Sequence, residues 1–417
     1  MRERRVVVTG LGAISALGAS VDETWRNAKA GVCGISTHTL DPGESGPEPH
    51  TLPLARVAAG YERSIVAGLG PRVLAGMDPF AAFALAASHE ALADAGLLGS
   101  PALDTRTAIV LGHGMGGLTS LESGYERFYG KKLARLHPTM VPRVMVSSAV
   151  SAVAMTFGVH GVVFATSSAC ASSAHAIAQA SAMITAGLAD VAIVGGSEAI
   201  STPGCMRAWQ AIHALSETTC KPFAKDRDGM VMGEGAGVLV IEALEHARAR
   251  GARVHGELVG AGMTSDAFHI TQPSLAGPTA AMRQACAAAK LAPGANVLIS
   301  AHGTGTSLND SNEAAAIREV FGERTANCPV IATKSGHGHL IGGSASLQAV
   351  IALRALAEGL APAIVNTLEP DPVCAVDLVL GAARPIAASH LLVNAFAFGG
   401  LNASLLFASA NAMDGAP

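Results

Sequence analysis

Charged side chains are scarce in this sequence, and their scarcity excludes several classes of protein. Asp, Glu, Lys and Arg make up only 14% of the 417 residues, while 50% of the residues are hydrophobic. A disordered chain has the opposite balance, so we expect a globular protein with a large buried core. The formal net charge of -4 at pH 7 provides no basic excess, and we expect no nucleic-acid partner.

Paired cysteines are also lacking. The seven cysteines form no CxxC pair and are scattered along the chain, which argues against a structural zinc site and against a disulfide framework. No apolar signal segment follows the N-terminus, so we expect a cytoplasmic location. Residues 144–189 carry no Asp, Glu, Lys or Arg, but Ser, Thr, Gly and His interrupt them throughout. We interpret this stretch as the buried centre of the protein and expect no membrane partner.

What the sequence does contain is a repeated pattern of apolar strand, glycine-rich turn and helix. Strands are predicted at residues 5–9, 108–111, 191–196, 254–259 and 297–300. The alternation with helices predicts an α/β fold with mostly parallel or mixed sheets covered by helices. Because the pattern begins again near residue 254, we expect two related halves.

Three local predictions follow from this pattern. Gly10 and Gly12 are interpreted as a plain turn, because Ser15 replaces the third glycine of a dinucleotide-binding motif. A helix is predicted through Glu242 to Arg250. Another is predicted over residues 344–358.

Cys170 stands at a position that can make a thiol reactive. An apolar strand ends at residue 166, small polar residues follow it, and an Ala-rich helix is predicted after the cysteine. A thiol at the first turn of a helix lies near unpaired N–H groups and the positive end of the dipole, which favour the thiolate. The alternative is a buried cysteine that packs as a small hydrophobic residue, as most cysteines do. Two histidine motifs farther along the chain favour a reactive thiol.

The two motifs are AHGTGT at residues 301–306 and TKSGHGHL at residues 333–340. Each places histidines in a glycine-rich loop after a strand, where backbone and ligand come close. A cysteine, two histidine motifs and Lys334 together suit acyl transfer to sulfur followed by carbon–carbon bond formation. Two imidazole N–H groups would stabilise the enolate that forms when a second thioester loses CO2. Glu313 is the expected ion-pair partner of Lys334.

A metal site is the alternative interpretation of these residues. His302, His337 and His339 could form one, and a cysteine thiolate beside two histidines could bind zinc. Lys334 in the same loop would repel a cation, so we expect no metal ion.

With these motifs the sequence resembles the β-ketoacyl-acyl-carrier-protein synthases of the condensing-enzyme, or thiolase-fold, superfamily. It is most similar to the type II elongating synthases and to relatives in polyketide and nodulation-factor pathways. The resemblance runs from VVVTG at residues 6–10 to NAFAFGG at residues 394–400. It implies a thiolase-like, five-layered α-β-α-β-α fold. Residues 1–253 would be the half with the nucleophilic cysteine, and residues 254–417 the half with the two catalytic histidines.

The resemblance implies an acyltransferase, a 3-oxoacyl-[acyl-carrier-protein] synthase. Such an enzyme joins a cysteine-bound acyl group to malonyl-ACP by decarboxylative Claisen condensation, giving β-ketoacyl-ACP and CO2 in fatty-acid or specialised polyketide and lipid biosynthesis. No separate cofactor is implied, because the substrates are carried on the phosphopantetheine of an acyl carrier protein. The implied partners are that carrier protein and a second subunit, either identical or resembling a chain-length factor.

Two other functions within the superfamily stay open at this point. A non-elongating chain-length-factor-like subunit would lack the cysteine, which is present here as Cys170. A CoA-dependent thiolase would need a second cysteine in the C-terminal glycine-rich loop, and residues 396–400 contain none.

Residue roles carried over by motif give a full candidate site. Cys170 would accept the acyl group, His302 and His339 would assist decarboxylation and condensation, and Lys334 with Glu313 would support them. The remaining roles are an oxyanion hole from the backbone N–H groups of Cys170 and Phe398, a gate at Phe398 with Phe396 beside it, phosphopantetheine contacts at Thr304 and Thr306, an acyl-pocket wall at Met115, and carrier-protein contacts at Lys131 and Lys132.

The sequence also departs from the family pattern. Ala397 stands where relatives commonly have glycine, and His337 stands where they have a small or polar residue. Residues 306–310 lack the proline and glycine that are often present there. These departures favour a dedicated synthase in a specialised pathway over housekeeping fatty-acid elongation.

Overall fold

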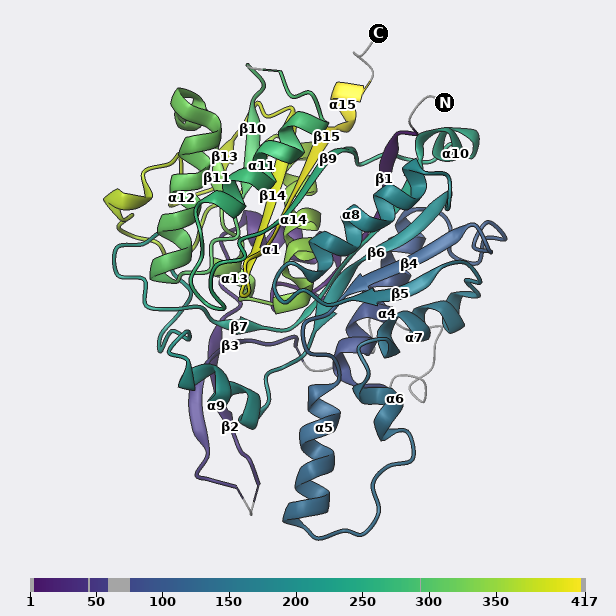
Figure 1. Ribbon diagram of the computed structural model, residues 1–417, viewed down its shortest axis with the longest axis vertical. Helices are drawn as coiled ribbons and strands as arrows, with labels where there is room; N and C mark the ends of the chain where they lie inside the picture. The colour runs from purple at the N-terminus through teal and green to yellow at the C-terminus, as the bar shows by residue number, and fades with distance from the viewer. Residues whose placement is uncertain (1–3, 44–45, 59–75, 293, 414–417) are drawn as a thin grey trace.

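The computed structural model describes residues 4–43, 46–58, 76–292 and 294–413, and a ten-stranded mixed sheet forms its centre (Figure 1). The strands of this sheet are β1 (Val6–Ile14), β4 (Thr107–Gly112), β5 (Val163–Thr166), β6 (Val191–Glu198), β8 (Gly235–Ala243), β9 (Gly256–Ser265), β10 (Val297–Ser300), β11 (Val330–Ile331), β14 (His390–Ala397) and β15 (Leu401–Ser409). Three strands on one side form a smaller sheet: β2 (Ser36–Leu40), β3 (His50–Ala55) and β7 (Met232–Gly233).

The strand order repeats itself across the sheet. The first half runs β5-β4-β6-β8-β1 and the second runs β11-β10-β14-β15-β9, and β1 and β9 join them as antiparallel neighbours. In each half the first three strands are parallel and the last two pairings are antiparallel. The prediction of an α/β fold built from two related halves is confirmed. The boundary predicted between residues 253 and 254 falls between α10 (Leu244–Ala249) and β9, and it stays a prediction.

The repeat places candidate reactive residues at equivalent points. Cys170 follows β5, and His339 follows β11, the corresponding strand of the second half. His302 follows β10, and His113 follows β4, which is the strand equivalent to β10. His113 is fully buried, with its Nδ1 atom 3.0 Å from the carbonyl oxygen of Ser197.

Each half of the sheet forms one layer. Helices lie between these two layers and on the outer face of each, which gives the layer order α-β-α-β-α (Figure 1). The central helices α8 (Ser172–Thr185) and α14 (Ser344–Glu358) pack on each other and on strands of both halves. Alternate strand residues face opposite layers: Val110 packs toward α8, and Ile109 toward the outer helices. The outer helices are α4 (Pro79–Asp94) and α7 (Ser148–Phe157) on the first half, and α11 (Ala276–Ala288) and α12 (Ser307–Phe321) on the second.

The remaining α-helices are shorter. They are α1 (Val21–Lys29), α5 (Leu118–Tyr125), α6 (Met140–Val144), α9 (Pro203–Ala211), α13 (Lys334–His337) and α15 (Ala410–Met413). Two short strands, β12 (Leu360–Ala361) and β13 (Arg384–Pro385), pair beside α14. Among the described residues, no helix combines the length and the apolar character that crossing a membrane requires.

Two predictions about local structure are wrong, and close packing of glycines explains the first. β1 continues through Gly10 and Gly12, because a Cβ atom there would lie 2.1 Å and 1.9 Å from carbonyl oxygens of α4. Glu242, predicted to open a helix, belongs to β8. At Gly237 in β8, a Cβ atom would lie 2.3 Å from the backbone nitrogen of Leu347 in α14. These glycines permit close helix–sheet packing and form no turn.

Candidate active site

Cys170 lies on a tight connection between β5 and α8. The residue before it, Ala169, has φ of +50°, a left-handed conformation that is uncommon for a residue with a side chain. The hydroxyl of Ser172, the first residue of α8, accepts the N–H of Ser168 at 2.8 Å and donates to the carbonyl of Ala169 at 2.7 Å. This turn directs the buried thiol of Cys170 into the interior and not along the sheet.

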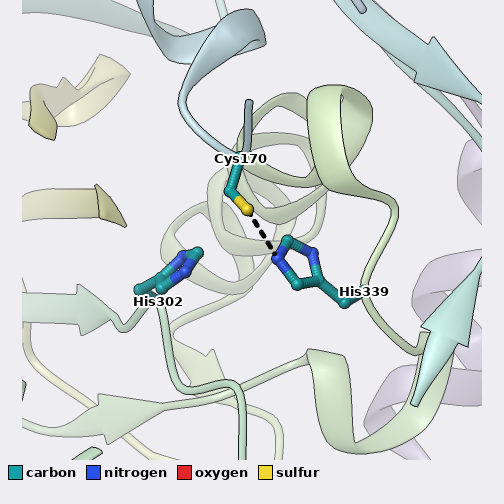
Figure 2. A group of neighbouring side chains, drawn as sticks. All are labelled: Cys170, His302 and His339. Atoms are coloured by element: carbon teal, nitrogen blue, oxygen red, sulfur yellow. Dashed lines mark hydrogen bonds between the residues drawn. The ribbon is translucent and has the colours of Figure 1, made fainter. Parts of the chain in front are cut away.

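Three reactive side chains meet there from three separate elements (Figure 2). The Sγ atom of Cys170 lies 3.1 Å from the Nε2 atom of His339, and the rings of His302 and His339 lie 5.4 Å apart and almost perpendicular, at 84°. All three line one cavity of about 380 Å³. The structure therefore brings together the cysteine and the two histidines that the sequence singled out.

Hydrogen bonds fix which nitrogen of each imidazole carries the proton. The backbone N–H of Ile341 donates to Nδ1 of His339 at 3.2 Å, so in the neutral ring the proton sits on Nε2, the nitrogen that faces Cys170. Lys334 donates from Nζ to Nδ1 of His302 at 3.4 Å, which leaves the proton of that ring on Nε2 as well. Both rings thus present N–H donors.

Both imidazoles are neutral in this environment. Burial lowers the pKa of His302 and of His339 well below the usual value, and the positive charge of Lys334 lowers both further. A neutral ring can donate from Nε2 without carrying a charge into the cavity. This is the protonation state that the predicted enolate stabilisation requires.

Lys334 does not form the direct ion pair that the sequence predicted. Its ammonium donates to the carbonyl oxygen of His302 at 2.5 Å and to Oε1 of Gln348 at 2.6 Å, in addition to Nδ1 of His302. These three acceptors match the three N–H donors of an ammonium group. No ion pair within 4.0 Å joins Lys334 to Glu313, although both residues are described. Burial lowers the pKa of Lys334, and the charge of Glu313 opposes that effect from a distance.

Glu313 instead holds the loop that carries His302. Its carboxylate accepts the backbone N–H groups of His302 at 2.8 Å and Gly303 at 2.9 Å, and the side-chain amide of Asn394 at 3.1 Å. Burial raises the pKa of this carboxyl group. Glu313 therefore supports the site by fixing backbone, and the pairing with Lys334 was the wrong prediction.

Sequence reasoning missed Asp310, which braces the same loop. Its carboxylate accepts the N–H groups of Thr304 at 3.0 Å, Gly305 at 3.1 Å and Phe223 at 2.8 Å. It lies fully buried one helical turn before Glu313 on α12. That spacing on one helix face was the available signal.

The expected preference of Cys170 for the thiolate is also wrong. Burial raises the pKa of this thiol to about 11. The charge of Lys334 and the backbone N–H groups of Phe398 and of Cys170 itself lower the pKa, but they do not outweigh burial. The resting side chain is a thiol, and the two N–H groups predicted as an oxyanion hole face its sulfur.

The cavity wall contains several of the other predicted residues. Thr304 and Thr306 line it, with their hydroxyl oxygens 2.9 Å apart. Phe396 lines it with its ring 6.1 Å from that of His302. Phe398 is 37% exposed and stacks on Trp209 at 6.0 Å, a contact that sequence reasoning did not anticipate.

Three predicted residues lie outside this cavity. Met115 is 43% exposed, with its Sδ atom 3.9 Å from the Sγ atom of Cys205. Lys131 and Lys132 are exposed beyond α5, and Lys131 pairs with Glu126 at 3.0 Å. The roles proposed for these three residues stay predictions.

The metal alternative takes a different form in the structure. The ligand atoms of Cys170, His302 and His339 lie within 4.8 Å of one another, whereas His337 bonds to Thr333 at 2.9 Å and is not part of this group. The ammonium of Lys334, bonded to His302, opposes a cation at this point.

The chain is similar to known proteins over most of its length. Residues 3–247 match the N-terminal domain of the β-ketoacyl synthase family, and residues 255–368 match its C-terminal domain. The chain is 38% identical to nodulation protein E of Rhizobium meliloti (strain 1021), over 97% of this chain and 99% of that protein. It is 36% identical to 3-oxoacyl-[acyl-carrier-protein] synthase 2 of Staphylococcus aureus (strain COL), over 97% and 98%.

Solved structures are similar over nearly the whole chain. The ishigamide ketosynthase/chain length factor matches with a TM-score of 0.90 and 31% identity, covering 98% of this chain and 99% of that one. A β-ketoacyl synthase from Burkholderia phymatum STM815 matches with a TM-score of 0.89 and 32% identity, covering 98% and 100%. A type II ketosynthase in complex with its acyl-carrier protein matches with a TM-score of 0.86 and 28% identity, covering 98% and 100%.

Proposed function

The chain belongs to the β-ketoacyl synthase family, and on that premise we propose that it catalyses the decarboxylative condensation of a cysteine-bound acyl group with malonyl-ACP. The products are β-ketoacyl-ACP and CO2, in fatty-acid or polyketide-type biosynthesis. The acyl groups are carried on the phosphopantetheine of the carrier protein, so the reaction uses no separate cofactor. The observation that supports this proposal is the meeting of one thiol and two imidazole N–H donors in one buried cavity.

The first step transfers the acyl group to Cys170. The sulfur attacks the thioester carbonyl of the acyl carrier protein, and the carbon–sulfur bond to phosphopantetheine then breaks. The N–H groups of Cys170 and Phe398 are placed to stabilise the negative oxygen that forms in between. The proton that Cys170 loses leaves with the departing phosphopantetheine thiol.

The second step makes the new carbon–carbon bond. Malonyl-ACP loses CO2, and the electron pair of the broken bond becomes an enolate whose oxygen accepts from Nε2–H of His302 and His339. The enolate carbon attacks the acyl carbonyl, and the sulfur of Cys170 leaves as a thiolate, which takes up a proton from solvent because burial raises its pKa. Lys334 keeps both imidazoles neutral throughout.

Other residues take supporting roles in this proposal. Thr304 and Thr306 contact the phosphopantetheine arm along the cavity wall. Phe398 acts as the gate, and Phe396 closes the wall beside His302. Met115 borders the acyl chain once a second subunit completes the pocket.

We propose that the enzyme works with a second subunit, either identical or resembling a chain-length factor. β5 is an edge strand of the ten-stranded sheet, and it pairs only with β4 among the described strands. Exposed apolar side chains surround that edge, including Met155 at 79% and Val162 at 48%. An open edge flanked by apolar surface favours pairing with another chain. The relatives include a ketosynthase in complex with its chain length factor.

The cytoplasm is the compartment that we propose. All seven cysteines are free thiols, which suits a reducing environment. The division into a cysteine-bearing half, 1–253, and a histidine-bearing half, 254–417, is part of the same proposal. A partner subunit without its own activity is disfavoured because Cys170 is in place, and a thiolase is disfavoured because Cys170 is the one cysteine among the described residues that line the cavity.

Intact-protein mass spectrometry tests the proposal directly. After incubation with acyl-ACP, the wild-type chain is expected to gain the mass of one acyl group, and Cys170→Ala is expected to gain none. Adding malonyl-ACP should then release the acyl group as β-ketoacyl-ACP. An equal adduct on wild type and Cys170→Ala would show that the nucleophile is another residue.

A further inference from the structure

Within the part of the chain that the structure describes, the buried ammonium of Lys334 is held by neutral acceptors only. Its partners are a backbone carbonyl, an imidazole nitrogen and the side-chain oxygen of Gln348, at 2.5, 3.4 and 2.6 Å. Gln348 lies on α14 and is fully buried, as is Lys334. A buried ammonium usually has a carboxylate as its direct partner, because burying a charge is costly. Here an amide occupies that place.

The amide of Gln348 can point only one way. Its Nε2 atom donates to the carbonyl oxygen of Ala301 at 2.7 Å, which lies directly before His302. Turning the amide over would place its NH2 group against the ammonium and its oxygen against that carbonyl. Gln348 therefore links Lys334 on one side to the backbone of the His302 loop on the other.

The nearby carboxylates do not cancel the ammonium charge by contact. Glu313 and Asp310 each accept backbone N–H groups and lie beyond 4.0 Å from Lys334. At that separation they raise the pKa of the lysine without forming a pair. The titratable and charged groups around this centre are Cys170, Glu198, Cys220, His302, Asp310, Glu313, Lys334, His337 and His339.

We propose that Gln348 is a positioning residue that aims the ammonium of Lys334 at His302 through a neutral contact and so leaves its full charge to act on Cys170, His302 and His339. In a buried site an uncancelled charge acts strongly over several ångströms. It favours the thiolate of Cys170 and disfavours protonation of the two imidazoles. The inference deepens the proposed condensation and rests on it only for the catalytic consequence.

Two substitutions separate the charge from the positioning. Gln348→Glu keeps the size of the side chain and adds a carboxylate at the ammonium, which cancels the charge by direct pairing. Gln348→Met keeps the length and the apolar packing, but it removes both hydrogen bonds and adds no opposing charge. Gln284→Glu is the matched control, because Gln284 is exposed on the outer helix α11.

The first measurement does not depend on condensation. The rate of Cys170 alkylation by iodoacetamide is followed at pH 7, below the pKa of about 8 to which burial lowers Lys334, so that the ammonium carries its charge. Mass spectrometry of the Cys170 peptide excludes the signal of the exposed Cys33. Cancelling the charge raises the pKa of Cys170, so Gln348→Glu should react about tenfold more slowly for each unit of that rise. Gln348→Met and Gln284→Glu should stay within about twofold of wild type.

The second measurement is malonyl-ACP decarboxylation. Gln348→Met should lose most of this activity, because Lys334 no longer holds the His302 ring, while its thiol reactivity persists. An alkylation rate in Gln348→Glu equal to wild type would overturn the inference. So would an equal loss of thiol reactivity in Gln348→Met, because it would indicate packing alone.

The two proposals fail in different ways. If wild type neither loads acyl groups nor releases CO2, the proposed condensation is wrong, and the alkylation results still decide the role of Gln348. If condensation is normal and Gln348→Glu alkylates at the wild-type rate, the role of Gln348 is wrong. Thermal unfolding of each variant verifies that the comparison is between folded proteins.

Discussion

The Nε2 atom of His339 lies 3.1 Å from the Sγ atom of Cys170, although the two residues are 169 positions apart in the sequence. One comes from the loop before α14, and the other from the loop before α8. The N–H of Ile341 fixes the proton of His339 on the nitrogen that faces the sulfur. The contact therefore joins the nucleophile of one half of the fold to a hydrogen-bond donor of the other.

Replacing His302 by Ala should impair decarboxylation more than acyl loading. The substitution removes one of two N–H donors to the enolate oxygen, and loss of one such donor lowers a rate by about 100- to 1000-fold. Radiolabelled CO2 release from malonyl-ACP measures this step, and intact mass measures loading of Cys170. Loading should persist in His302→Ala. A variant that fails to load but decarboxylates normally would reverse the assigned roles.

Alkylation of Cys170 should keep accelerating as the pH rises. Burial raises the pKa of this thiol to about 11, so the thiolate fraction grows about tenfold per pH unit between pH 6 and 7.5, where Lys334, with its pKa lowered to about 8, keeps its charge. Iodoacetamide rates at the Cys170 peptide, measured every half unit, should show no plateau in this range. The exposed Cys33 serves as an internal reference. A plateau near pH 7 would indicate a preformed thiolate.

Treatment with EDTA should leave condensation unchanged. The ligand atoms of Cys170, His302 and His339 are close enough to hold an ion, but the ammonium of Lys334 beside His302 opposes a cation. Activity is compared before and after chelation and dialysis, with metal content measured on the same samples. Loss of activity that zinc restores would favour the metal alternative.

Replacing Trp209 by Ala should broaden the range of acyl chains that load. The indole lines the cavity and stacks on Phe398 at 6.0 Å, so its removal frees the gate and enlarges the wall. Competition among acyl-ACPs of increasing length, resolved by intact mass, measures the range. Trp209→Phe retains an aromatic ring for stacking and should stay close to wild type. An unchanged range in Trp209→Ala would place the limit elsewhere.

Local patterns were sufficient for the elements that carry the reactive groups. The helix predicted over residues 344–358 coincides with α14, and the strand, turn and helix around Cys170 are present. The same patterns failed at the end of β8, where Glu242 was predicted to begin a helix, and at Gly10 and Gly12, where a turn was predicted and α4 packs closely against β1. A glycine needed for close approach has no sequence signature that separates it from a glycine in a turn.

The sequence did not predict which side chains contact each other across the fold. The sequence paired Lys334 with Glu313 as opposite charges, because it does not reveal the backbone and amide groups that each one contacts. Gln348 reads as one more polar residue on a helix, and its contact with Lys334 depends on how α14 lies against the loop after β11. Burial likewise decided the pKa of Cys170, since the helix start alone predicted the opposite direction.

The repeated strand order has an evolutionary consequence. Two identical copies of one such unit would carry identical residues at matching places, two thiols or two imidazoles facing each other. Joining the copies in one gene lets each mutate alone. Equivalent points can then hold unlike groups, as with Cys170 and His339. They can also hold a buried residue in one half and a functional one in the other, as with His113 and His302. The asymmetry that the chemistry needs was thereby open to selection.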